Sequence, residues 1–91
     1  MDNLIDLDEV DFVIREHGRV SSLIQVCWDL SDPRTKGREF RALLKAGADL
    51  RCNNLLCLTR GMTGTEAFSW DGQSIRVRML PIEEWLTTGP A

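Results

Sequence analysis

The sequence predicts an α/β domain built on a small mixed sheet, with its elements in the order ββαβ(ββ)α. Three observations support this prediction. Apolar runs of strand length are rich in Val, Ile and Phe, one long segment has helical periodicity, and glycine-containing turns separate neighbouring runs. The chain has 91 residues, of which 43% are hydrophobic and 27% are charged, and this is an ordinary globular composition. We therefore expect a single domain.

The first two predicted strands form a β-hairpin. Residues 9–15 and 20–28 are rich in β-branched and aromatic side chains, and the segment 16–19 between them contains a glycine suited to a tight turn. His17 lies in this turn. Because the chain has no second histidine that could share a metal ion, we assign His17 no functional role.

A long periodic segment predicts a helix over residues 33–50. Ser31 or Asp32 can cap the free amides, and Pro33 fits the first turn. One side of this helix is apolar and should pack on the sheet; it consists of Phe40, Leu43, Leu44, Gly47 and Leu50.

Three further elements follow the long helix. Residues 54–59 form a nearly continuous apolar run, which is typical of a strand buried on both faces. A strand, a helix and a buried strand in this order predict a parallel crossover, which is almost always right-handed. Residues 65–70 and 74–79 predict a second hairpin around an Asp-Gly turn, and residues 81–86 predict a short closing helix that begins at a proline.

Composition also limits the functional class. A net charge of -3 and a pI near 5.0 argue against coating of nucleic acid through bulk charge. The three cysteines, Cys27, Cys52 and Cys57, lack metal-site spacing and indicate a reduced, intracellular protein. The N-terminus is acidic, unlike a signal peptide, and no apolar run approaches the roughly 20 residues of a membrane span. We expect a cytoplasmic protein without membrane contact.

Three separated blocks resemble a known family. They cover residues 9–14, 23–30 and 38–46, with the sequences EVDFVI, LIQVCWDL and REFRALLKA. In this order and spacing they resemble the C-terminal domain of prokaryotic AAA-type ATPases of uncharacterised role, a domain similar to the PD-(D/E)xK restriction-endonuclease-like superfamily. The resemblance covers most of residues 9–86. It implies one restriction-endonuclease-like domain over 9–91, after an N-terminal segment 1–8 that replaces most of the usual first helix.

The same resemblance implies a metal site in which one residue is acidic and two others depart from the pattern. The family places an acid near the end of the first strand, here Asp11, and an acid-x-lysine pair on the second strand, here Gln25 and Cys27. Residues two apart on a strand share a face, so these positions would converge. Gln25 offers a metal only a neutral carbonyl oxygen, and Cys27 is a neutral replacement for lysine. The motif is therefore degenerate.

Two interpretations of this motif remain open. In the first, Asp11 and Gln25 still hold Mg²⁺ or Mn²⁺, and helix residues such as Glu39 and Lys45, or Lys36, supply the missing acid and lysine. In the second, Asp11 is structural and its carboxylate accepts hydrogen bonds from backbone amides at the edge of the sheet.

Two features bear on nucleic acid. A basic stripe on the outer side of the long helix, formed by Arg38, Arg41 and Lys45, either contacts phosphates or is a solvated face. The tryptophans are interpreted as core and rim packing, although exposed rings would stack on bases.

The leading hypothesis is a non-catalytic or weakly active accessory domain, related to the tail of an AAA-type ATPase, whose partner is a protein or a second copy of itself. The alternatives are a metal-dependent DNA nuclease with a rearranged site, which would use Mg²⁺ or Mn²⁺, and a DNA-binding module without cleavage. No G-x-x-x-x-G-K-[ST] motif is present, so we expect no ATP binding by this chain alone and no certain cofactor.

Overall fold

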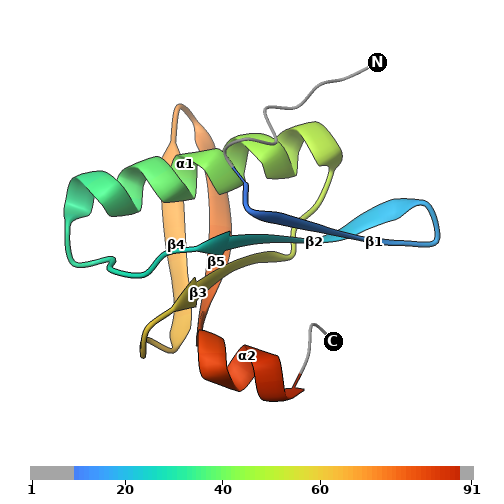
Figure 1. Cartoon of the computed structure of the whole chain (residues 1–91). Coiled ribbons are helices and arrows are strands. Elements are labelled where there is room, and N and C mark those ends of the chain that lie inside the picture. Colours follow the sequence, from blue (N-terminus) through green and yellow to red (C-terminus); the bar gives the residue numbers. More distant parts are fainter. Residues whose placement is uncertain (1–9, 89–91) are drawn as a thin grey trace.

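A computed structural model of the chain describes residues 10–88 and has a mixed α/β architecture (Figure 1). Its elements in chain order are β1 (Phe12–Glu16), β2 (Arg19–Val26), α1 (Pro33–Leu50), β3 (Leu55–Thr59), β4 (Gly64–Trp70), β5 (Gln73–Pro81) and α2 (Ile82–Thr88). The five strands form one sheet in the order β1-β2-β3-β5-β4. This confirms the predicted fold class and the predicted ββαβ(ββ)α order.

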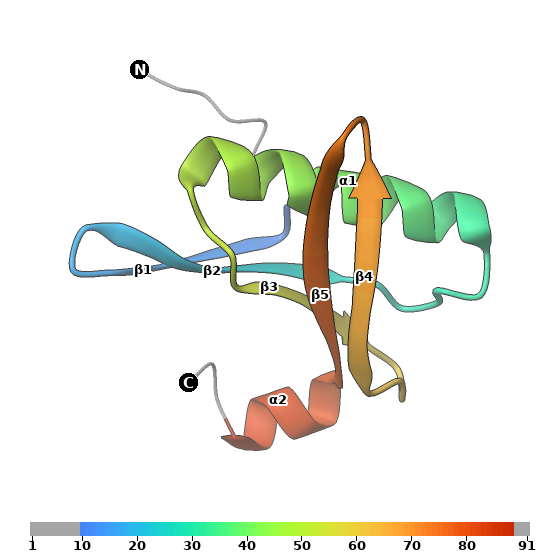
Figure 2. The same cartoon turned by 180° about the vertical axis from the view of Figure 1, so that it is seen from behind.

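The sheet is parallel at its centre and antiparallel at both edges. Strand β3 pairs in parallel with β2 and with β5, whereas β1 pairs with β2 and β4 pairs with β5 as antiparallel hairpins. The sheet is strongly twisted, so that β1–β3 run across the view while β4 and β5 run up it (Figure 2). All five residues of β3 are buried, as expected for a strand with neighbours on both sides and helices over both faces.

Both hairpins close through two-residue turns with the left-handed backbone that suits twisted strands. The φ angles are 55° at His17 and 77° at Gly18, and 54° at Asp71 and 79° at Gly72. Two successive positive φ values are the pattern of a type I′ turn. His17 thus has a local structural role in the turn, and its side chain is exposed.

Helix α1 covers one face of the sheet and begins and ends as the sequence predicts. Asp32 caps its first turn, where Oδ1 accepts a hydrogen bond from the Arg34 amide at 2.9 Å, and Pro33 opens the helix. Arg51 ends it in the left-handed conformation, and the Cys52 amide donates to the Gly47 carbonyl at 2.9 Å.

The main core lies between α1 and the sheet. Its buried residues are Val10, Leu23, Cys27, Leu30, Phe40, Leu43, Ala46, Cys52, Leu55, Cys57, Val77 and Met79. Phe40 is fully buried and packs edge-on against Phe68 of β4, with ring centroids 5.5 Å apart. At Gly47 the segment between α1 and β3 passes so close to the helix that a Cβ atom would lie 2.8 Å from the Cys52 carbonyl oxygen.

A smaller cluster lies on the other face, where α2 packs beside β3 and β5 (Figure 1). It is formed by Ile24, Leu56 and Leu58, with Ile14, Val26, Leu80, Ile82 and Trp85 packed against it. The indole Nε1 of Trp85 is buried without a hydrogen-bond partner among the described residues.

Several element boundaries differ from the predictions. The first strand was expected over 9–15, but β1 starts at Phe12 because Asp11 instead bonds to the end of β2. Strand β2 ends at Val26, two residues early. Pro81 still pairs with Thr59, so α2 begins at Ile82. The expected N-terminal segment 1–8 lies outside the described residues.

Neither helix within residues 10–88 is long and apolar enough to cross a lipid bilayer.

Candidate functional site

Asp11 connects the start of β1 to the end of β2. Its carboxylate Oδ2 accepts a hydrogen bond from the Val26 amide at 2.8 Å, and its own amide donates to Oε1 of Gln25 at 3.0 Å. The Asp11 side chain is exposed. The carboxylate thus satisfies a backbone donor at the end of a strand, which is the structural arrangement considered from the sequence.

Gln25 lies in the interior between the sheet and α1, with only 3% of its surface exposed. Besides accepting from Asp11, its side chain donates from Nε2 to Oε1 of Glu39 at 2.6 Å. Glu39 is half-buried on α1. The helix therefore brings an acid to the second motif position, as one of the two sequence interpretations requires, but this acid accepts a hydrogen bond from the glutamine.

Cys27, which the resemblance places at the lysine position of the motif, is part of the apolar core. Cys27 is 2% exposed, and its sulfur lies 2.9 Å from the sulfur of fully buried Cys57 on β3. The hydrogen bond with Cys27 and burial both raise the pKa of the Cys57 thiol, and the negative charges of Glu39 and Glu66 add to this shift. Cysteine, unlike lysine, has no positively charged form, so Cys27 contributes no positive charge to the site.

The two lysines considered as replacements lie in different surroundings. Lys36 forms an ion pair with Glu66 of β4, with Nζ and Oε2 2.5 Å apart, and its ammonium lies 5.8 Å from the centre of the Phe40 ring. Lys45 is exposed and lines a groove on the outer side of α1.

Asp11, Gln25 and Glu39 are joined by a connected set of hydrogen bonds. Both oxygen groups expected to hold a metal, the Asp11 carboxylate and the Gln25 carbonyl, accept hydrogen bonds from backbone amides. Within residues 10–88, no three side chains among His, Cys, Asp and Glu are grouped so that they could hold a metal ion. These oxygen atoms do not fit a site for Mg²⁺ or Mn²⁺, which prefer several converging carboxylates.

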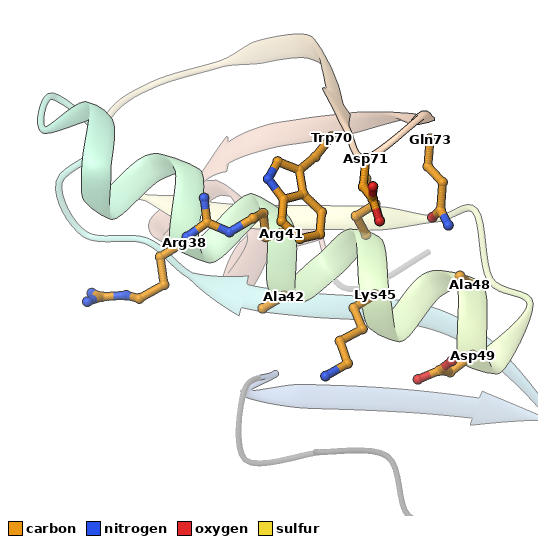
Figure 3. Close-up of a pocket in the computed structure, with 10 residues that line it drawn as sticks. Arg38, Arg41, Ala42, Lys45, Ala48, Asp49, Trp70, Asp71 and Gln73 are labelled. Atoms are coloured by element: carbon orange, nitrogen blue, oxygen red, sulfur yellow. The ribbon is translucent and has the colours of Figure 1, made fainter.

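The basic stripe is exposed as predicted and lines a groove together with the turn between β4 and β5 (Figure 3). We call this hollow of about 450 Å³ the α1–β4 groove; it is lined by Arg38, Arg41, Ala42, Leu44, Lys45, Ala48, Asp49, Trp70, Asp71 and Gln73. The guanidinium carbon of Arg41 lies 5.6 Å from the centre of the Trp70 ring.

Sequence reasoning missed the pairing of Trp70 with the stripe, because the two are far apart along the chain. One signal was available. Trp70 is the last residue before the Asp-Gly turn, and a hairpin end projects beyond the sheet. A large aromatic residue at such a position is poorly placed for the core, and Trp70 is 51% exposed.

A second exposed aromatic residue lies beyond the ends of β2 and β3. Trp28 is also 51% exposed, and the guanidinium carbon of Arg60 lies 5.8 Å from its ring centre. The two residues line a hollow of about 340 Å³ with Asp29, Leu30, Ser31 and Met62. Two tryptophans thus lie at the rim, while Trp85 is half-buried under the sheet.

Comparison with models of known protein families finds no match, and comparisons with curated proteins and with solved structures find none either. The restriction-endonuclease-like resemblance therefore depends on the three sequence blocks alone.

Proposed function

We propose that this chain is a non-catalytic accessory domain of restriction-endonuclease-like ancestry, which acts through contacts with another protein. The partner is an AAA-type ATPase of the kind whose C-terminal domain the sequence resembles, or a second copy of the chain. Two observations support the proposal. These are the order of the three sequence blocks and the hydrogen bonds made by the residues at the motif positions.

One observation carries the non-catalytic part. The Asp11 carboxylate, the single acid left from the motif, accepts the Val26 amide at 2.8 Å. A metal ion at this oxygen would compete with that hydrogen bond and would find in Gln25 a carbonyl that already accepts from the Asp11 amide. With Cys27 in the core, the site also lacks the positive charge that assists an attacking water.

The second candidate function, a metal-dependent nuclease with a rearranged site, is favoured by one specific contact. Glu39 Oε1 lies 2.6 Å from the Gln25 amide nitrogen, so a carboxylate does reach the second motif position. If Asp11 and Glu39 turned toward a shared cation, a two-carboxylate site would result. Glu39→Gln and Asp11→Asn therefore separate the two functions.

The first experiment is a cleavage assay on the purified 91-residue chain. Supercoiled plasmid, linear duplex and single-stranded DNA are incubated with Mg²⁺ or Mn²⁺, and the products are followed on gels. We expect no cleavage above a protein-free control. Cleavage that requires the metal and disappears in both Asp11→Asn and Glu39→Gln would overturn the non-catalytic proposal.

A parallel measurement tests the structural role of the Asp11 carboxylate. Asp11→Asn weakens a charge-assisted hydrogen bond to the Val26 amide, so thermal unfolding should occur at a lower temperature than in the wild type. Asp49→Asn, which removes an exposed carboxylate from α1, is the matched control and should leave the midpoint nearly unchanged. Equal midpoints for Asp11→Asn and the control would contradict the structural role.

The interaction part is tested by association. Sedimentation equilibrium of the chain alone measures self-association, and mixing with a purified AAA-type ATPase from the same source measures hetero-association. Either a dimer or a complex at micromolar concentration supports the proposal. A chain that remains monomeric alone and does not bind the ATPase at 10 to 100 times that concentration would overturn it.

A further inference from the structure

The α1–β4 groove combines positive charge with an exposed aromatic ring. Arg38, Arg41 and Lys45 are spaced by three and four residues, so they follow one another along the outer side of α1. All three are exposed. Opposite them, the end of β4 supplies Trp70, beneath which Arg41 extends (Figure 3).

The positive charge of this groove contrasts with the acidity of the whole chain. Of the 14 acidic residues, four lie in the first nine positions, whereas all 11 lysines and arginines lie between residues 15 and 78. The described part of the chain thus carries 11 basic and 10 acidic residues. A local basic surface is therefore compatible with the overall charge of -3.

The two kinds of charge occupy different parts of the groove. The arginines lie along the first half of α1, while Asp49 lies near its end and Asp71 lies in the hairpin turn. An anionic ligand should therefore contact the arginine end and leave the carboxylate end to uncharged parts of the ligand.

The pairing of Arg41 with Trp70 suits both parts of a nucleotide. A guanidinium that stacks on a ring keeps its N–H groups in its own plane, where they can donate to phosphate oxygens. The Trp70 ring, 51% exposed, can stack against a base at the same time. In duplex DNA the base faces are covered by neighbouring base pairs, so this ring favours an unpaired strand.

The groove also continues beyond its first hollow. A second hollow of about 830 Å³ shares Leu44, Ala48 and Gln73 with it and extends toward the start of β3. Most residues that line this second hollow are apolar, which suits further bases, and Arg76 adds a positive charge to it.

We infer that the α1–β4 groove binds single-stranded nucleic acid, with an unpaired base stacked on Trp70 and phosphates held by Arg38 and Arg41. Lys45 adds positive charge beside them. The inference concerns a surface separate from the degenerate motif, so it stands whether or not that motif is catalytic and whether or not the chain binds another protein.

The test uses fluorescence anisotropy with a labelled 15-nucleotide oligo(dT) and a labelled duplex of the same length. We expect tighter binding of the single strand, and an affinity that falls steeply with salt concentration. Trp70→Leu should weaken binding at least about fivefold, the lower range for the loss of one stacked base. Arg41→Glu should weaken it further and lower the salt dependence.

Trp28 and Arg60 provide matched controls. Trp28 is as exposed as Trp70, and Arg60 contacts its ring as Arg41 contacts the ring of Trp70. Among the residues that line the hollow beside Trp28, however, Arg60 is the single basic residue. Trp28→Leu and Arg60→Glu should leave the affinity for oligo(dT) within about twofold. Circular dichroism and thermal midpoints show whether each variant remains folded.

Several outcomes would overturn the inference. These are no binding of oligo(dT) by the wild-type chain at low salt, equal losses in the groove variants and the controls, and tighter binding of the duplex than of the single strand. Competition by polyglutamate as effective as that by unlabelled oligo(dT) would also overturn it, because the groove would then recognise charge without bases.

Discussion

Gln25 and Glu39 form a hydrogen bond of 2.6 Å between the C-terminal end of β2 and the sheet-facing side of α1. The donor is a buried amide and the acceptor a half-buried carboxylate, so the contact is charge-assisted and largely shielded from water. It fixes the helix against the sheet at the level of Gln25.

Replacement of Glu39 tests this contact. Glu39→Leu removes the acceptor while keeping the size of the side chain, and we expect a loss of about 2 kcal/mol in the free energy of unfolding. Glu39→Gln retains an acceptor oxygen without the charge and should lose less than half as much. Urea unfolding followed by circular dichroism measures both; equal losses in the two variants would argue against a role for the hydrogen bond.

Two glycines of α1 should respond in opposite ways to alanine. At Gly47 the added Cβ would lie 2.8 Å from the Cys52 carbonyl oxygen, so the segment between α1 and β3 must move away from the helix. We expect Gly47→Ala to destabilise the chain by about 1–3 kcal/mol despite the better helix propensity of alanine.

Gly37→Ala is the control for that substitution. Its Cβ would meet only the end of the flexible Arg41 side chain, at 3.4 Å. Alanine is favoured over glycine inside a helix, so this variant should gain up to about 1 kcal/mol. Thermal midpoints that fall for both variants, or rise for both, would contradict the close approach at Gly47.

The buried thiol pair predicts a dependence of stability on pH. The contact with Cys27 and burial raise the pKa of Cys57 in the folded chain, whereas thiols of the unfolded chain titrate near pH 8.5. Above that pH the unfolded state loses a proton that the folded state retains, so the free energy of unfolding falls by up to about 1.4 kcal/mol per pH unit for this group.

Urea midpoints between pH 7 and pH 9.5 measure this effect. The Cys57→Ala variant lacks the group and should show a flatter decline, although its stability at pH 7 is lower because of the lost packing. Parallel declines in the variant and the wild type would show that Cys57 does not contribute.

The turn between β1 and β2 predicts an unusual order of substitutions at His17. Its φ of 55° is accessible to Asn but strained for a β-branched residue. We therefore expect His17→Val to be about 1 kcal/mol less stable than His17→Asn, although valine favours strands. Thermal unfolding compares them, and a more stable valine variant would contradict the type I′ turn.

Much of the fold was predictable because its signals are local. The limits of α1 follow from Asp32, Pro33 and the apolar period that ends at Leu50, and the second hairpin follows from the Asp-Gly turn. The error at β1 has a tertiary cause. Asp11 continues an apolar run in sequence, but its carboxylate accepts from the Val26 amide, which no local pattern reveals.

The candidate sites were predictable only in part. Sequence reasoning named Glu39 as an acid that helix geometry could bring toward Gln25, and it recognised a structural role for Asp11 as an alternative. It did not pair Trp70 with Arg41, because 29 positions separate them and their contact depends on how the twisted sheet directs the second hairpin toward α1. Such contacts require the three-dimensional arrangement of whole elements.

The central position of β3 has a consequence for the order of folding. Each hairpin joins strands that are adjacent in sequence and can close within microseconds. Strand β3, by contrast, must insert between β2 and β5, and its partner residues on these strands lie about 20 to 30 positions away in the sequence. The chain must therefore close large loops, at a cost in conformational entropy, before β3 can form its contacts. Docking of β3 should therefore limit the folding rate, and its amides should exchange with solvent only through global unfolding.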